Sequence, residues 1–377
     1  MADYIIDLGA YESTFGKAGE DKFESKERMI MVDSDDPLIQ SPVLNSLSTM
    51  AKERIFGNEA LKFKNVLNVR NILKDQNYDA FASLIQEIFE SHYLDPRDFG
   101  LILIVPQNFP NIYKEKIQDI LFSRLHFPKI TYLTHGMCAL TALGKDTGAV
   151  VDIGHYSTRV EGFFKGFPNE ECHKELPVGG YHITDRLVEL ISPKLNYDVS
   201  VPLKWLAEEI KQNHVKCELN PGEIIQQIQK GSIDYGQKFE MPDGKILKLG
   251  RELFECTEIF FNPSLIHVHS KNIVDLLEES IRSWDRSNVP QLAKNILVCG
   301  NGGSIEGLTN KISLMLQERF PKSIEVEFLD LKDRKGIFWI GASVLYMKRK
   351  GKMEWIPNPN QNISQKKDNN TQEGNNQ

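Results

Sequence analysis

Cysteine is scarce in this chain, and its spacing argues against two structural features that depend on cysteine. Only five of the 377 residues are cysteine, they are scattered, and no two of them form a C-x-x-C pair. The sequence therefore predicts neither a zinc site nor a disulfide framework. This usage is typical of a protein in a reducing compartment, and we expect a cytoplasmic location.

Long apolar runs and long basic runs are also missing. No apolar run approaches the length that crosses a bilayer, so no membrane span is expected, and the first residues lack the pattern of a signal peptide. The formal net charge is −7 and basic residues do not cluster, so nucleic acid is not an expected partner. What remains is a soluble composition, 41% hydrophobic and 26% charged, in a chain long enough for two domains or one two-lobed body.

Two separate stretches share one pattern. Residues 4–19 read YIIDLGAYESTFGKAG, in which an apolar run ends in Asp7 and a turn follows through Gly9. Residues 149–162 read AVVDIGHYSTRVEG, with Asp152 and Gly154 in the matching places. Each stretch predicts a β-hairpin with an acid and a glycine at its tip.

One such hairpin by itself is usually an ordinary turn, so the prediction depends on the repeat. Glycine lets backbone N–H groups approach phosphate oxygens closely. A carboxylate can hold Mg²⁺, usually through water. Two Asp-x-Gly hairpins that face each other therefore predict a phosphate clamp around a nucleotide.

The elements around the hairpins repeat as well. After the first hairpin, apolar periodicity predicts a helix at 81–89, a buried strand at 101–105, a helix at 117–125, a strand at 130–133 and a helix at 136–143. After the second, it predicts a helix at 183–195, an insertion at 196–261, a helix at 273–284, a strand at 296–299, a glycine loop at 300–303, a helix at 305–316, a strand at 324–328 and a helix at 338–347. The pattern predicts a duplicated α/β unit with an insertion in each half, and two lobes with a cleft between them.

Several longer motifs resemble the actin family. Residues 17–21 (KAGED) continue the first hairpin as in that family's first phosphate loop, and the second hairpin resembles its second loop. The resemblance extends to 241–256 (MPDGKILKLGRELFEC), 261–264 (FNPS), the adenosine loop at 295–307, and the signature 334–345 (RKGIFWIGASVL). It covers residues 4–355 in order and with near-constant spacing. The divergence resembles archaeal actin homologues or a distant actin-related protein more than a muscle-type actin.

The resemblance implies a fold and a division of the chain. The fold is a duplicated actin-like, ribonuclease-H-like α/β architecture with two lobes and a central nucleotide cleft. The expected division is a small-lobe core at 1–30, 72–142 and 336–356, its insertion at 31–71, a large-lobe core at 143–178 and 269–335, its insertion at 179–268, and a tail at 357–377. Because this tail is rich in Asn, Gln, Lys and Pro, it is expected to be disordered.

The resemblance also implies ATP or ADP with Mg²⁺ as cofactors. Asp7 and Asp152 match the metal-linked acids, which act on Mg²⁺ through water, and Gly9, Gly154 and Gly300 match backbone contacts to phosphate. Lys211 matches a lysine beside the adenosine, and Lys335 matches one near the base. The remaining implied nucleotide contacts are Ala10, Tyr11, Thr14, His155, Tyr156, Gly180, Gln212, Asn301, Gly302 and Gly303.

Several of these positions depart from the family pattern. Thr14 stands where actins have a lysine that reaches the β- and γ-phosphates, so a charged hydrogen bond of about 1.5–3 kcal/mol is lost there. Lys17 is a poor substitute, because three residues along a strand place it on the opposite face. His155 occupies an aspartate position beside the phosphates, Gln212 replaces a glutamate near the ribose, and Asn301 replaces a glycine.

The hydrolytic residues differ too. His135 stands where actins have the glutamine that orients the attacking water, and Arg159 replaces a histidine. With Asp152, these are the catalytic candidates of a weak ATPase: His135 can orient a water and Arg159 can offset developing negative charge. In the alternative interpretation, His135 caps a helix and Arg159 pairs with a surface acid.

Two functions follow from the resemblance. In the first, the chain is a cytoskeletal subunit that assembles head to tail with copies of itself when ATP is bound, with actin-binding regulators as further partners. In the second, it does not polymerise, ATP is a structural ligand, and the chain acts as a scaffold or cap with other actin-family proteins. Thr14, His135, His155 and the altered segment 44–54 favour the second, and the polar tail, which also differs from actin, bears on assembly. A metabolic kinase is the weakest candidate, because no catalytic base for a substrate hydroxyl is evident.

Overall fold

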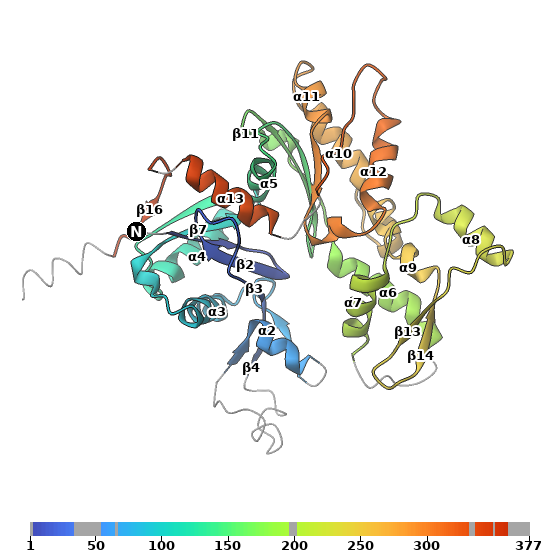
Figure 1. Cartoon of the computed structure of the whole chain (residues 1–377), viewed down its shortest axis with the longest axis horizontal. Helices are drawn as coiled ribbons and strands as arrows, with labels where there is room; N and C mark the ends of the chain where they lie inside the picture. The colour runs from blue at the N-terminus through green and yellow to red at the C-terminus, as the bar shows by residue number, and fades with distance from the viewer. Residues whose placement is uncertain are drawn as a thin grey trace, which may run out of the picture. The chain divides into compact units, whose positions relative to one another are not determined.

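The computed structural model describes residues 3–33, 54–64, 67–195, 202–331, 336–349 and 351–360. The chain divides into two compact units, unit 1 with residues 1–142 and 338–377 and unit 2 with residues 143–337. Each unit combines a central sheet with helices (Figure 1). This mixed α/β content confirms the predicted fold class.

Unit 1 is organised around one mixed sheet. In the part of the chain that the structure describes, this sheet has six strands in the order β16-β8-β7-β1-β2-β3. The strands are β1 (Asp3–Asp7), β2 (Glu12–Lys17), β3 (Ser25–Arg28), β7 (Gly100–Val105), β8 (Lys129–Thr134) and β16 (Ile356–Pro357). β1 pairs antiparallel with β2 and parallel with β7, so the first hairpin lies inside the sheet.

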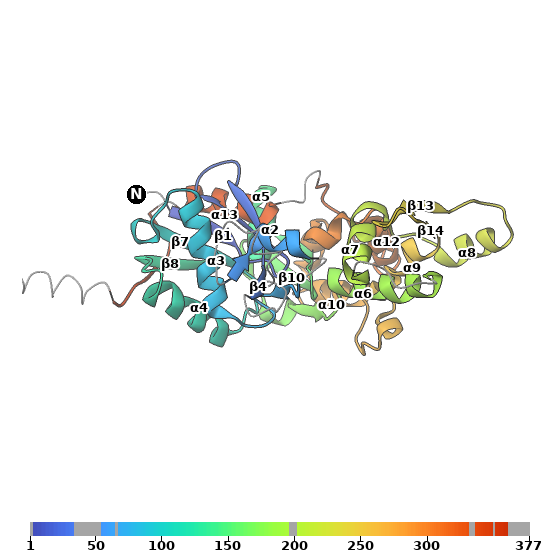
Figure 2. The same ribbon diagram turned by 90° about the horizontal axis from the view of Figure 1, so that it is seen from below.

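Helices cover both faces of this sheet. Alternate residues of a strand point to opposite faces, and accordingly Tyr4 and Ile6 share one apolar cluster with α3 and α4, while Ile5 shares another with α5 and α13. α3 and α4 lie side by side (Figures 1 and 2). The helices of this unit are α2 (Gly57–Ala60), α3 (Tyr78–Ser91), α4 (Asn111–Ser123), α5 (His135–Ala142) and α13 (Ile337–Lys348).

A second, smaller sheet of unit 1 includes part of the expected insertion. Its described strands have the order β5-β4-β6 and are β4 (Ile30–Asp33), β5 (Arg54–Phe56) and β6 (Arg70–Asn71). Ile30, Val32, Ala60 and Leu67 form a small apolar cluster beneath it. Most of the segment 44–54 lies outside the described residues.

The ordered chain continues past the expected start of the tail at residue 357. β16 pairs antiparallel with β8, with Ile356 opposite Ile130 and Pro357 opposite Lys129. The side-chain amide of Asn358 is buried and donates to the carbonyl oxygens of Phe122 and Phe127, at 3.3 and 2.9 Å. A polar residue here satisfies main-chain acceptors, so a polar composition was the wrong reason to end the fold at 356. Residues 361–377 lie outside the described residues.

Unit 2 repeats the arrangement of unit 1. Its strands are β9 (Gly148–Ile153), β10 (Thr158–Phe164), β11 (Phe167–Pro168), β12 (Lys174–Leu176), β15 (Ile296–Cys299) and the separate hairpin β13 (Gln237–Glu240) and β14 (Ile246–Leu249). β9 pairs antiparallel with β10 and parallel with β15, and β12 pairs antiparallel with β10. In unit 1 the corresponding pairs are β1 with β2, β1 with β7, and β2 with β3. This equivalence supports the duplicated unit that the sequence predicted.

The helices of unit 2 build one large core on the sheet. Ala149, Val151 and Ile153 of β9 are fully buried with residues of α6, α7, α10 and α12. The helices are α6 (Gly180–Ile191), α7 (Leu203–His214), α8 (Pro221–Gln229), α9 (Glu252–Glu255), α10 (Ile273–Arg282), α11 (Val289–Ala293) and α12 (Leu308–Gln317). Across the described ranges, no helix combines the length and the apolar character needed to span a membrane.

The strand predicted at 324–328 is not present as a full strand. Phe328 makes only an isolated parallel bridge with Ile296. The amide of Ile296 donates to the carbonyl oxygen of Glu327 at 3.0 Å, and the amide of Leu329 donates to that of Ile296 at 2.7 Å. The segment touches the edge of the sheet at one point, which is too short a contact to form a ladder.

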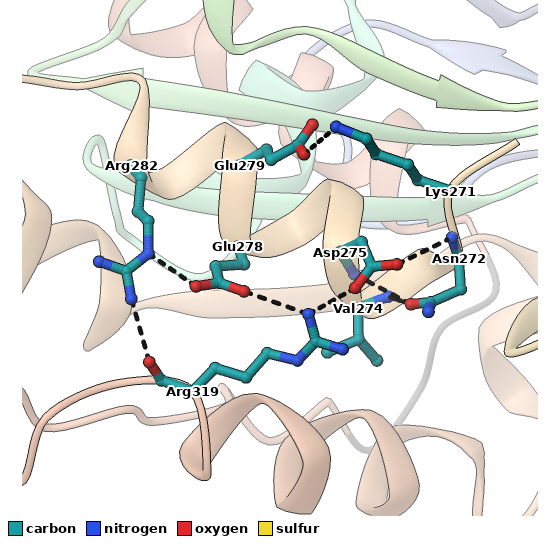
Figure 3. Close-up of polar contacts among 8 residues, drawn as sticks. All are labelled: Lys271, Asn272, Val274, Asp275, Glu278, Glu279, Arg282 and Arg319. Atoms are coloured by element: carbon teal, nitrogen blue, oxygen red, sulfur yellow. Dashed lines mark hydrogen bonds and ion pairs between the residues drawn. The ribbon is translucent and has the colours of Figure 1, made fainter.

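An ion-pair network joins α10 to the end of α12. The guanidinium of Arg319 lies between the carboxylates of Asp275 and Glu278 (Figure 3). Arg282 donates to Glu278 at 2.7 Å and to the carbonyl oxygen of Arg319 at 3.0 Å. Asn272 caps α10 by accepting from the amides of Val274 and Asp275 at 2.9 and 3.0 Å. Because several charges share partners, the network should stabilise more than an isolated surface pair.

We expect Arg319→Met to lower the free energy of unfolding by about 1 kcal/mol, because two carboxylates lose a shared partner. The loss should shrink in 1 M NaCl, where exposed charges are screened. Chemical denaturation at low and high salt measures it. Lys294→Met is the matched control, since its pair with Glu325 is exposed on both sides. Equal effects for the two variants would contradict the network.

Close packing of α5 against α13 depends on a glycine. A Cβ on Gly341 would overlap the carbonyl oxygen of Cys138, a main-chain atom that cannot move aside. We expect Gly341→Ala to destabilise the protein by about 3 kcal/mol, measured by thermal unfolding. Gly222 in α8 faces open space, so Gly222→Ala should be neutral or slightly stabilising. A Gly341→Ala protein as stable as the unchanged one would refute this packing.

Candidate functional site

Asp7 ends β1 inside the sheet of unit 1. It lies opposite Thr14 in the antiparallel pair with β2, and both side chains are buried. The tight turn requires glycine at position 9, because a Cβ there would overlap the carbonyl oxygen of Glu12. The turn is held from outside by Asn71, whose amide donates to the carbonyl oxygen of Ala10 at 2.6 Å. Tyr11 packs under the guanidinium of Arg28, 3.5 Å from the ring centre.

His135 lies against Asp7. It begins α5 directly after β8, and its Nε2 is 2.9 Å from Oδ1 of Asp7. Because an ionised carboxylate only accepts hydrogen bonds, this contact places a proton on Nε2. The ring also stacks on Phe338, with 4.5 Å between ring centres. His135 is therefore fixed by a carboxylate on its edge and an aromatic ring on its face.

Asp152 and Arg159 form the corresponding pair in unit 2. They lie opposite each other on β9 and β10, with 3.8 Å between Oδ2 of Asp152 and Nη1 of Arg159. Nε of Arg159 is 3.6 Å from Glu175, which lies opposite it on β12. One arginine thus lies between two acids in a row across three strands. In both units the acid at the hairpin tip has a basic partner.

The turn of the second hairpin is fixed to the start of α6. The amides of Gly180 and Tyr181 donate to the carbonyl oxygens of Gly154 and His155, at 3.0 and 2.7 Å. Gly179 permits this approach, because a Cβ there would lie 2.6 Å from the carbonyl oxygen of Gly154. The first N–H groups of α6 are thus used to hold the loop.

Aromatic rings gather around this turn. His155 packs edge-on against Tyr156, with 4.5 Å between ring centres, and Tyr156 lies 5.3 Å from Tyr181. The ammonium of Lys204 lies 3.7 Å from the centre of Tyr181. His155, which the resemblance placed beside phosphate, is therefore part of an aromatic group.

Lys211 and Gln212 project from α7 toward the start of α6. Nζ of Lys211 donates to the carbonyl oxygen of Gly180 at 3.0 Å and to Oγ1 of Thr184 at 2.8 Å, and it pairs with Glu208. The amide of Gln212 donates to the other oxygen of Glu208 at 3.3 Å. Sequence reasoning missed Glu208 and Thr184, although their helical spacing from Lys211 and Gly180 is a signal that could have found them.

The glycine loop after β15 is pressed against the second hairpin. Gly300 has a φ of +75°, and a Cβ there would lie 2.5 Å from Oδ1 of Asp152. A Cβ on Gly302 would overlap Ile153. Asn301 and Gly303 belong to the following turn, Asn301–Ser304. Lys335 lies outside the described residues.

A comparison with family models identifies the chain. The model described as Actin matches residues 2–204 and 196–358, which is most of the sequence. The chain belongs to the actin family.

Two curated relatives in the actin family agree with this. A protein named putative actin-29 from Dictyostelium discoideum is 23% identical over 348 residues, which cover 90% of this chain and 89% of that protein. A protein named actin-like protein 9 from Bos taurus is 26% identical over 263 residues, which cover 69% of this chain and 62% of that protein. The resemblance to actin predicted from the motifs is confirmed.

Each half of the site fits the cofactors that the actin family implies. The turns have glycine at positions where a Cβ would overlap neighbouring atoms. The buried acids carry the hard oxygen donors that Mg²⁺ prefers. In the described ranges no group of three His, Cys, Asp or Glu side chains could hold a metal, so any Mg²⁺ would rely on water and phosphate for most of its ligands. Asp7 in unit 1 and Asp152 in unit 2 each lie against a basic side chain.

The strand that carries Arg159 also faces a half-buried histidine. Nδ1 of His173 is 3.9 Å from Oε1 of Glu161, and burial, with Arg159 nearby, lowers the pKa of His173. As the pH falls, His173 therefore becomes protonated in the unfolded chain at a higher pH than in the folded chain. The free energy of unfolding should fall as the pH drops below about 6.5.

We expect His173→Asn to reduce this acid-side loss, measured as the free energy of unfolding at pH 7.5 and pH 5.5. His126→Asn is the control, because His126 is exposed. If the two variants show the same pH dependence, the lowered pKa of His173 is not the cause of the acid-side loss.

Proposed function

We propose that this actin-family protein binds ATP with Mg²⁺ through its two Asp-x-Gly hairpins. The observation that carries the proposal is the equivalent placement of Asp7 and Asp152. Asp7 is the last residue of β1 and Asp152 is the second-last residue of β9, the two strands have the same pairing with their neighbours, and a glycine turn follows each acid. Backbone amides at such turns, with a metal held through the acids, suit a polyphosphate.

The adenosine contacts of the proposal come from unit 2. Lys211 donates to Gly180, Gln212 donates to Glu208, and Gly300 and Gly302 of the loop after β15 pack against the second hairpin. Lys211 and Gln212 bind and orient the nucleoside, and the two turns together with Gly300 bind the phosphates. Mg²⁺ supplies positive charge that offsets the charge of the triphosphate.

We further propose that the chain is a cytoplasmic, cytoskeletal subunit that assembles head to tail when nucleotide is bound. The family match over both units and the 89% coverage of the relative named putative actin-29 support it. A contact between two different faces that does not close generates a helical filament. Copies of the chain are then its main partners, together with other actin-family proteins and actin-binding regulators.

Hydrolysis in this proposal is slow. Phosphoryl transfer depends on positioning and charge. The ring of His135 is held by Asp7 and Phe338, so it is poorly placed to follow an attacking water. Arg159 is shared between Asp152 and Glu175, so it stabilises the negative charge that develops on the phosphate less strongly.

The same contacts favour one alternative function. If the hydrolytic residues serve only to hold the acids, ATP is a structural ligand that stabilises the fold by mass action. The chain would then act without polymerising, as a scaffold or a cap for other actin-family proteins.

A single preparation tests these functions. The purified protein is incubated with Mg²⁺ and ATP, imaged by negative-stain microscopy, and assayed for phosphate release in the same tube. We expect filaments that release phosphate only slowly. Monomers at all salt and protein concentrations, with tight ATP binding, would select the alternative.

Asp7→Asn should abolish assembly and weaken ATP binding at least tenfold, because it removes a charged acceptor without changing shape. Asp98→Asn is the control, since Asp98 is exposed in the same unit. Unchanged binding by Asp7→Asn in calorimetry would refute the site.

A further inference from the structure

The triphosphate of the proposed function needs a cation beside the first hairpin. A fully ionised ATP carries several negative charges, and a hydrogen bond from a charged donor is about twice as strong as a neutral one. Thr14, opposite Asp7, supplies no charge. Lys17 lies at the other end of the hairpin, opposite Tyr4, and pairs with Glu20 at 3.6 Å.

Lys26 lies next to Thr14 on the neighbouring strand and carries the positive charge that Thr14 lacks. In the register of β2 and β3, Lys26 is directly opposite Thr14, and Thr14 is directly opposite Asp7. Directly opposite residues point to the same face of a sheet. Asp7, Thr14 and Lys26 therefore form one row across three neighbouring strands.

The ammonium of Lys26 already crosses to the neighbouring strand. Neighbouring strands are about 4.8 Å apart, and the four-carbon stem of a lysine is long enough to cover that distance. Nζ of Lys26 donates to Oε1 of Glu12 on β2 at 3.0 Å. Glu12 follows the glycine turn, so the charge of Lys26 lies at the tip of the hairpin rather than in solvent.

Several contacts fix Lys26 in this place. Its carbonyl oxygen accepts from the side-chain amide of Asn58 at 2.7 Å. Its ammonium lies 5.0 Å from the centre of Phe23, which packs edge-on against the buried ring of Trp339. The side chain of Lys26 is only 20% exposed and that of Glu12 is 27% exposed, so the pair is partly shielded from water.

From this geometry we infer that Lys26 is the phosphate-binding cation of the first hairpin, a specificity residue for nucleotides that carry β- and γ-phosphates. Glu12 holds the ammonium at the tip until a nucleotide arrives, and the phosphate oxygens then take its place as acceptors. Arg28, which is opposite Glu12 on the same strands, packs on Tyr11 and shapes the turn. The inference rests on the proposed function, because it assigns a residue to that site.

Calorimetry with ATP and with adenosine tests the assignment. We expect Lys26→Met to weaken ATP binding about 10- to 100-fold and to leave adenosine binding within twofold, because only the phosphates lose a partner. Lys17→Met, a lysine of the same hairpin that is also paired with an acid, should change neither. Adding Thr14→Lys to Lys26→Met should restore most of the ATP affinity, since it returns a lysine to the same row.

Other results would overturn the inference. If Lys26→Met matches Lys17→Met, or weakens ATP and adenosine equally, Lys26 has only a structural role. If Lys26→Met does not fold, Glu12→Gln provides a second measurement. That variant should strengthen ATP binding severalfold by releasing Lys26, and weaker ATP binding would count against the inference. If the unchanged protein binds no ATP at all, the proposed function itself fails, which this series separates from failure of Lys26 alone.

Discussion

Each half of the site depends on a buried carboxylate near the end of the first strand of that unit's main sheet, held against a basic group. Such an acid is costly to bury without a partner. Asp7 finds one in His135, at the start of α5, and Asp152 finds one across the hairpin, in Arg159. Both units therefore stabilise a buried acid with a basic side chain, which comes from a helix in unit 1 and from the neighbouring strand in unit 2.

The same pairing limits the chemistry of the proposed site. Groups that hold an acid in place cannot freely follow a water or a transition state, because each contact restrains their geometry. His135 and Arg159 are restrained in this way. Positive charge for a phosphate then has to come from another strand, and β3 is the neighbour that carries it. In the proposed function, slow hydrolysis and the phosphate-binding role of Lys26 have one cause. The basic groups His135 and Arg159 are held by the two acids, so the charge for the phosphate comes from Lys26.

Much of the fold could be predicted because the relevant signals are local. The apolar spacing of 81–89 is present in α3, and the run 101–105 is the buried strand β7. The failures have a common reason. The buried Asn358 donates to main-chain carbonyl groups of residues far away in the sequence, and residues 324–328 pair with β15 at only one position. Neither fact can be read from composition or periodicity, which report a residue's own preferences and not its neighbours.

The sequence by itself determined the repeated Asp-x-Gly hairpins, the duplicated α/β order and the membership of the actin family, because these depend on residue types and spacing along the chain. Only the tertiary structure decided which groups touch: His135 on Asp7, Arg159 between two acids, Glu208 behind Lys211, and Lys26 in the row of Thr14. The physical reason is that strand register and helix packing bring together residues far apart in sequence. A contact of a few ångströms is set by that packing, and no local pattern encodes it.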